Sequence, residues 1–318
     1  MDDPRQSPLP EPALERVRGE HPTSESWRAD AFAASRHSDL RDEISRPLEV
    51  HDPEAAEALC AEVCRNALGG LAAGLVLLTA GERRRAQAIA ACAATLFDFA
   101  DQTGLEGDKL AQLNRWEFEL ERALDGDPAG QPVFVQLARL HAEAPWPAEV
   151  LDGLVAAARR RVAAPRPPSE ARLEAECRQL GRLALAALGV EAPTDGAIEL
   201  TGLLVRTRRL LAFGEGLRRH RIMLPGDGAG EHSTPGTTES LESSARRAAV
   251  LEKAHLAARL EGASVLRREL PQRLRPAGRF VLDAARILLR RFDAEAPLPP
   301  PELRLWERLR LLLTSRRA

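Results

Sequence analysis

From Pro53 to the C-terminus, apolar residues recur at helical spacing almost without interruption, and this pattern constrains the fold more than any other feature. One helix face is marked by Ala55, Leu59, Val63 and Ala67. The same spacing returns over residues 86–100 and 110–124. Because residues three and four positions apart share a helix face, the pattern predicts amphipathic helices. No segment alternates apolar and polar residues between turns as a half-buried strand does, so the chain is predicted to be all-α.

Glycine and proline clusters divide this helical pattern into segments. The predicted breaks fall at Gly81, Gly104 with Gly107, 125–128, 145–147 and 165–168. Further helices are expected over about 169–189, 195–220, 241–270, 276–294 and 301–315. The sequence therefore predicts eight to ten helices. No repeat of fixed period is present, which argues against a solenoid.

The N-terminal segment differs from the rest of the chain. Residues 1–52 are rich in Pro, Glu, Arg and Ser and predict a disordered tail, apart from a short helical piece around 29–35. A helical domain follows over 53–317, with a mobile loop at about 225–240. The start of the chain lacks the apolar core of a signal peptide. The longest apolar run, 71–80, is shorter than the roughly 20 residues of a membrane-spanning helix. A cytoplasmic protein is expected, with membrane association left open.

Charge and composition exclude one class of function. The chain has 45 basic and 47 acidic residues, and a binder of nucleic acid usually shows a basic excess. Tyrosine is absent, and aromatic residues make up 4% of the chain, which leaves little surface for stacking bases. Nearly all basic residues are arginine, a bias that indicates codon usage and not phosphate recognition. No nucleic-acid partner is therefore expected.

The cysteines and tryptophans predict packing and no cofactor site. Cys60, Cys64, Cys92 and Cys177 lie in apolar helical stretches without CxxC spacing, which is typical of buried structural thiols. Cys60 and Cys64 share one helix face, so half of a metal site is the alternative. The tryptophans are spread too widely for a cofactor site, and packing in the core or at an interface is expected for Trp27, Trp116, Trp146 and Trp306.

Several motifs together carry a resemblance to a known family. They are LFDFADQTGLEGD at 96–108, WEFEL at 116–120, GRLAL at 181–185 and FGEGLRRHRIMLP at 213–225. In type and order they resemble the active-site helices of the squalene/phytoene synthase family, and the hydroxysqualene synthase branch of the hopanoid pathway is the most similar. The resemblance covers about residues 55–315. The alternative, an unrelated arginine-rich bundle, does not explain why the spacing agrees over so many elements.

The resemblance implies a fold and a reaction. The fold is the isoprenoid synthase type, a helical bundle around a central cavity. The family joins two prenyl diphosphates head to head, and its squalene-forming members use NADPH. Mg²⁺ ions held between aspartate pairs on two helices stabilise the diphosphate leaving group, since hard cations prefer carboxylate oxygens. Acids four positions apart on a helix point the same way and can share one metal cluster.

The first aspartate motif is mostly lost. Aligned with the family, its positions are Asp101, Gly104, Leu105 and Asp108. Gly104 and Leu105 stand where the family has paired aspartates, and Asp101 stands where it has an arginine. Only Asp108 remains of this motif.

The second motif is lost entirely. Its two aspartates correspond to Ala212 and Gly216, and the asparagine one turn earlier corresponds to Arg208. No aspartate occurs between Asp195 and Asp227, so no shift of the alignment restores the pair. The sequence therefore predicts a protein of squalene, hopanoid or carotenoid biosynthesis that lacks ordinary Mg²⁺-dependent prenyl transfer. No metal ligand is assigned, and neither Mg²⁺ nor NADPH is predicted as a cofactor.

The remaining charged residues leave alternatives open. Asp98, Asp101, Glu106 and Asp108 could form a shifted metal site, which would make the chain an active prenyltransferase with relocated ligands. Solvated acids at helix ends are the other explanation. The chain could also act without catalysis. It would then hold a prenyl diphosphate or polyisoprenoid ligand, or form a hetero-oligomer with an active paralogue.

Arg208 is the predicted diphosphate-binding residue, because guanidinium groups match phosphate oxygens. It would point into the cavity and form a salt bridge with Asp101 or Asp108 when no ligand is bound. The alternative is that the helix is rotated and Arg208 lies in solvent. Its neighbours Arg206 and Arg209 are predicted to be surface charges.

Overall fold

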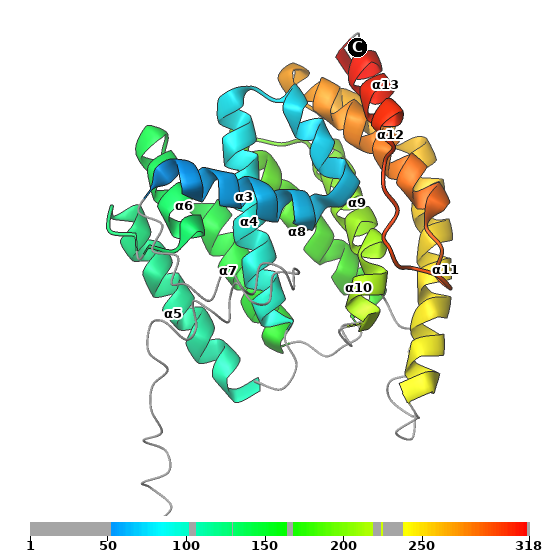
Figure 1. Cartoon of the computed structure of the whole chain (residues 1–318), viewed down its shortest axis with the longest axis horizontal. Helices are drawn as coiled ribbons and strands as arrows, with labels where there is room; N and C mark the ends of the chain where they lie inside the picture. The colour runs from blue at the N-terminus through cyan, green and yellow to red at the C-terminus, as the bar shows by residue number, and fades with distance from the viewer. Residues whose placement is uncertain are drawn as a thin grey trace, which may run out of the picture. The chain divides into compact units, whose positions relative to one another are not determined.

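The computed structural model describes residues 52–101, 106–128, 130–163, 168–218, 224 and 238–316 (Figure 1). Every regular element in these ranges is a helix, so the all-α prediction is confirmed. The predicted tail lies outside the described residues except for Asp52. The predicted mobile loop at 225–240 also lies outside them, except that residues 238–240 already belong to a helix.

The first half of the described chain forms five α-helices and one 3₁₀ helix. They are α3 (Pro53–Leu68), η3 (Gly69–Leu77), α4 (Ala80–Ala100), α5 (Glu106–Leu124), α6 (Pro132–Glu143) and α7 (Ala148–Ala163). Local sequence explains where these helices begin. The Asp52 side chain accepts hydrogen bonds from the first turn of α3. Thr79 and Glu82 form a reciprocal capping box at the start of α4.

The second half forms six α-helices and two short 3₁₀ turns. They are α8 (Glu170–Ala187), α9 (Asp195–Leu211), α10 (Phe213–Arg218), α11 (Thr238–Gly262), η4 (Leu266–Glu269), η5 (Gln272–Leu274), α12 (Arg275–Arg291) and α13 (Leu305–Arg316). The described part of the chain thus holds eleven α-helices, more than the eight to ten predicted. The difference arises mainly because the helix expected over 195–220 is interrupted at Ala212, where α9 ends.

Helices α4, α8 and α9 occupy the middle of the bundle (Figure 1). Helices α5, α6 and α7 lie on one side of them in this view, and α11, α12 and α13 lie on the other. The close approach of α8 and α9 depends on Gly181 and Gly202. A Cβ atom at Gly181 would lie 2.6 Å from the backbone nitrogen of Gly202, so no larger residue fits without separating the helices. This crossing brings the polar side chains of α8 and α9 together.

The four cysteines are free and buried, which confirms the structural prediction for them. Burial raises the pKa of Cys60, Cys64 and Cys177 to about 12. In the described residues, no group of three or more His, Cys, Asp or Glu side chains could hold a metal ion. The alternative of a half metal site at Cys60 and Cys64 therefore finds no support there.

Two tryptophans pack as predicted, and one does not lie in the core. Trp116 and Trp146 are buried, and Trp146 donates its ring N–H to the Leu137 carbonyl at 3.1 Å. Trp306 on α13 is 55% exposed. Trp27 lies outside the described residues.

One described helical stretch, Pro53–Leu77, is long enough and apolar enough to cross a membrane. It combines α3 with η3, so it is longer than the apolar run 71–80 taken alone. Core helices of soluble proteins pass the same test, so this stretch does not by itself locate the protein.

Candidate functional site

The C-terminal end of α4 is tied to α7 by a buried ion pair. Asp101, the C-cap of α4, accepts a hydrogen bond from Nη1 of Arg161 at 3.1 Å. The same guanidinium lies over the Phe97 ring, 3.8 Å from its centroid. Both partners of the ion pair are buried. The Asp101 carboxylate therefore faces a fixed cation held in place by an aromatic ring.

This pair is part of a longer chain of alternating charges, which we call the inter-helix ion chain: Asp101, Arg161, Glu176 and Arg209. Arg161 Nε donates to Glu176 Oε1 at 2.6 Å. Arg209 Nη2 donates to the same carboxylate oxygen. The chain runs from α4 through α7 and α8 to α9, and its two carboxylates balance its two guanidiniums. Each acid is neutralised by protein arginine.

A buried lysine lies next to this chain. Lys109, near the start of α5, donates from Nζ to the carbonyl of Ala100 at 3.3 Å. Carbonyl groups in the last turn of a helix lack partners within the helix, and a cation there interacts favourably with the helix dipole. Lys109 thus stabilises the end of α4 and fixes the start of α5 beside it.

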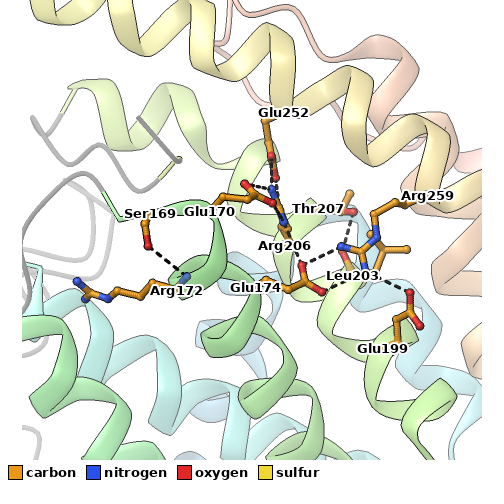
Figure 2. A network of polar contacts seen from close by, with 10 residues as sticks. All are labelled: Ser169, Glu170, Arg172, Glu174, Glu199, Leu203, Arg206, Thr207, Glu252 and Arg259. Carbon is orange, nitrogen blue, oxygen red and sulfur yellow. Dashed lines mark hydrogen bonds and ion pairs between the residues drawn. The ribbon is translucent and has the colours of Figure 1, made fainter. Parts of the chain in front are cut away.

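A second buried network surrounds Arg206 (Figure 2). Arg206 Nη2 donates to Glu252 on α11 at 2.6 Å and to Glu170 on α8 at 2.8 Å, and Nη1 donates to Glu174 at 3.0 Å. Arg259 on α11 donates to Glu174 at 2.8 Å. Burial disfavours the charge of Arg206, but hydrogen bonds with Glu252 and Glu170 outweigh this and raise its pKa. The network joins α8, α9 and α11.

The prediction that Arg206 and Arg209 are surface charges is therefore wrong. Arg206 is only 1% exposed, and Arg209 is largely buried against Glu176. The two arginines stand three positions apart on α9, and glutamates on α8 face them. The sequence held one signal for the pairing of α8 glutamates with α9 arginines. Acids stand at 170, 174 and 176 in one predicted helix, and arginines stand at 206 and 209 in the next.

The structure places the Arg208 guanidinium at the end of α3. Its Nε donates to the Ala67 carbonyl, and its Nη2 donates to the Asn66 carbonyl at 3.1 Å. Arg208 thus stabilises the last turn of α3, where carbonyls lack helical partners. It is half-buried, so full exposure is wrong. Of its two predicted salt-bridge partners, Asp101 is bound by Arg161, and the side chain of Asp108 lies outside the described residues, so the predicted salt bridge stays a prediction.

A family model described as squalene/phytoene synthase matches residues 70–308. The chain belongs to the squalene/phytoene synthase family. The family prediction is confirmed by this match, which spans most of the helical domain. Comparison with curated protein sequences finds no match.

Two solved structures support the fold of this family member. A dehydrosqualene synthase crystallised with a ligand aligns at a TM-score of 0.58 and 16% identity, covering 84% of this chain and 98% of that chain. The squalene synthase HpnC from Alicyclobacillus acidocaldarius aligns at a TM-score of 0.54 and 19% identity, covering 82% and 96%. These likenesses confirm the isoprenoid synthase fold.

The residues that the sequence alignment assigns to the family's second metal-binding motif do not fit Mg²⁺. Ala212 and Gly216 have no side-chain oxygen. The nearby Glu215 is buried and forms an ion pair with Arg218. Mg²⁺ prefers several oxygen ligands in octahedral geometry. This part of α9 and α10 offers no carboxylate pair.

The first motif also offers few carboxylate ligands for a metal ion in the described part of the chain. Gly104 and Leu105 lie outside the described residues, as do the side chains of Glu106 and Asp108. Of the other two acids in the alternative metal site, Asp101 is neutralised by Arg161, and Asp98 lies half-buried on α4. The shifted metal site therefore stays a prediction, and one of its carboxylates, that of Asp101, is bound by Arg161.

Proposed function

We propose that this member of the squalene/phytoene synthase family serves isoprenoid biosynthesis without Mg²⁺-dependent prenyl transfer. The observation that carries the proposal is the inter-helix ion chain. It joins the helices that bear the aspartate pairs in the family. In this protein, the carboxylates of the inter-helix ion chain, Asp101 and Glu176, bind arginines: Arg161 and Arg209.

The physical argument concerns the charge of the leaving group. Ionisation of an allylic diphosphate places negative charge on the departing oxygen, and metal ions normally stabilise that charge. Loss of a single stabilising donor costs roughly 100- to 1000-fold in rate in well-studied enzymes. Ala212 and Gly216, which the proposed alignment places at the second motif, supply no ligand for a metal ion, and on that alignment the contribution of the second motif is absent.

The decisive experiment is an assay of the purified full-length chain with farnesyl diphosphate, Mg²⁺ and NADPH. We expect no squalene-type product above the control without protein, while an active family member makes product under the same conditions. Product that disappears on addition of EDTA would refute the proposal. Loss of that product in Asp101→Asn would then favour the active prenyltransferase with relocated ligands.

A second candidate function is non-catalytic binding of a prenyl diphosphate, and Arg209 favours it. Its Nη1 atom is buried and has no hydrogen-bond acceptor within the described structure. A buried donor without a partner costs about 1–3 kcal/mol, and a phosphate oxygen would satisfy it. We therefore assign diphosphate binding, which was predicted for Arg208, to Arg209, because Arg208 already donates to two carbonyls of α3.

Calorimetry with pyrophosphate in EDTA tests this second candidate. Arg209→Gln should weaken binding about 10-fold or more, in line with a charge-assisted hydrogen bond of about 1.5–3 kcal/mol. Arg268→Gln is the control, because Arg268 is an exposed arginine outside the ion chain. Equal affinity in the two variants would reject Arg209 as the anion-binding residue. Co-purification with an active paralogue tests the separate prediction of a hetero-oligomer.

A further inference from the structure

The last helix presents an apolar and basic surface to solvent. The exposed residues of α13 are Leu305, Trp306, Leu309, Arg310, Leu313 and Arg316, which we call the α13 face. At 3.6 residues per turn they span an arc of about 140°. Leu305 is 73% exposed and Leu313 is 61% exposed. Throughout α13, all of which the structure describes, no carboxylate lies on this arc.

The orientation of α13 is set by contacts on its opposite side. Glu307 is buried and accepts hydrogen bonds from Nη1 of Arg291 at 2.9 Å and from the backbone N–H of Arg304 at 2.8 Å. Leu311 and Ser315 are also buried on that side. Because the helix is held by an ion pair and by packing, its leucines cannot turn inward without breaking both. The exposed apolar surface is thus a fixed feature of the fold.

We propose that the α13 face docks on the surface of an anionic lipid bilayer, with the helix lying in the interfacial plane. Leucine and tryptophan side chains favour the boundary between headgroups and acyl chains, and arginines beside them attract anionic headgroups. Arg310 and Arg316 lie within the face, and the exposed Arg304 adjoins its N-terminal end. Docking would place the protein beside the phase in which apolar isoprenoids dissolve.

Charge favours lipid over a second copy of the chain as the occupant. Two α13 faces packed together would bring arginines from both copies close to one another, without a carboxylate on either face. Like charges across an interface oppose association. An anionic membrane instead supplies complementary charge along the whole face. This inference does not depend on whether the protein catalyses prenyl transfer.

Vesicle sedimentation with the full-length protein tests the proposal. We expect binding to vesicles of phosphatidylcholine and phosphatidylglycerol, and at least 10-fold weaker binding to phosphatidylcholine alone. Leu309→Glu should weaken binding to the anionic vesicles at least 10-fold. Phe118→Glu should bind like the wild type, because Phe118 is equally exposed (57%, against 53% for Leu309) but lies on α5, on the other side of the bundle (Figure 1).

Circular dichroism establishes that both variants are folded before binding is compared. Failure of the folded wild-type protein to bind anionic vesicles would overturn the proposal, as would an equal loss in Leu309→Glu and Phe118→Glu. Light scattering measures the oligomeric state of the wild type and of Leu309→Glu. A wild-type dimer that becomes monomeric in Leu309→Glu, without lipid binding, would assign the face to a second copy of the chain and overturn the lipid proposal.

Discussion

Replacing Arg161 by methionine tests whether the inter-helix ion chain holds the centre of the bundle together. Arg161 is 7% exposed and links Asp101 on α4 to Glu176 on α8. Methionine has similar length and can still pack on the Phe97 ring. The substitution therefore removes the charge and the hydrogen bonds while leaving most of the apolar contact.

The expected cost is about 3 kcal/mol of folding free energy. Removing one partner of a buried ion pair typically costs about 3–5 kcal/mol, because a charge is left behind in a poorly solvated place. Glu176 keeps its bond to Arg209, so the lost attraction is mainly that between Arg161 and Asp101, which puts the cost at the lower end. At about 2 °C per kcal/mol for a domain of this size, the melting temperature should fall by about 6 °C.

The matched control is Arg159→Met, on the same helix. Arg159 pairs with Glu117 at the surface, where both side chains are about 40% exposed. Exposed pairs contribute about 0–1 kcal/mol, so this variant should be close to the wild type. Urea unfolding followed by circular dichroism gives both free energies.

The double variant Arg161→Met with Asp101→Asn completes the test. It also removes the negative charge of Asp101, so we expect the double variant to be no less stable than Arg161→Met alone. In a double-mutant cycle, this result appears as a coupling free energy between Arg161 and Asp101. A cost below 1 kcal/mol for Arg161→Met, or a cost equal to that of Arg159→Met, would show that the ion chain does not stabilise the fold.

Three further predictions follow from the same packing. A hydrogen bond from Arg259 holds the pKa of Glu174 below its ordinary value. The ionised Glu174 therefore stabilises the fold above about pH 4.3, and this contribution is lost as the pH falls. Between about pH 6 and 3.5, the urea midpoint of Glu174→Gln should drop less steeply than that of the wild type. Gly181→Ala should cost about 1–3 kcal/mol by pushing against Gly202, whereas Gly81→Ala, with nothing within 4 Å, should be neutral in thermal melts. The four buried cysteines should react with an aromatic disulfide reagent only after unfolding, and fast labelling of the native protein would contradict their placement.

The helices and many of their ends could be predicted from sequence because their causes are local. The capping box of Thr79 with Glu82 and the turn after Gly69, which has a φ of 57°, involve residues only a few positions apart. The break at Ala212 was missed. Backbone hydrogen bonds continue across it, from Ala212 N–H to Arg208 and from Gly216 N–H to Ala212, so nothing in the apolar period marks it.

The charged residues of α9 could not be placed from sequence. Arg206 and Arg209 read as surface charges because their partners lie on other helices. Glu252 is 46 positions from Arg206 along the chain, and Glu176 is 33 positions from Arg209. No local pattern states which acid meets which arginine, since that depends on how α8, α9 and α11 cross.

The sequence by itself determined that the chain is helical and which family it belongs to, since both depend on the kind and order of residues, and it predicts that the second aspartate motif is lost. Only the tertiary structure decided what holds this region together. An ion pair requires side chains from separate helices to come within about 4 Å. The close crossing of α8 and α9 at Gly181 and Gly202 brings Glu176 and Arg209 within that range.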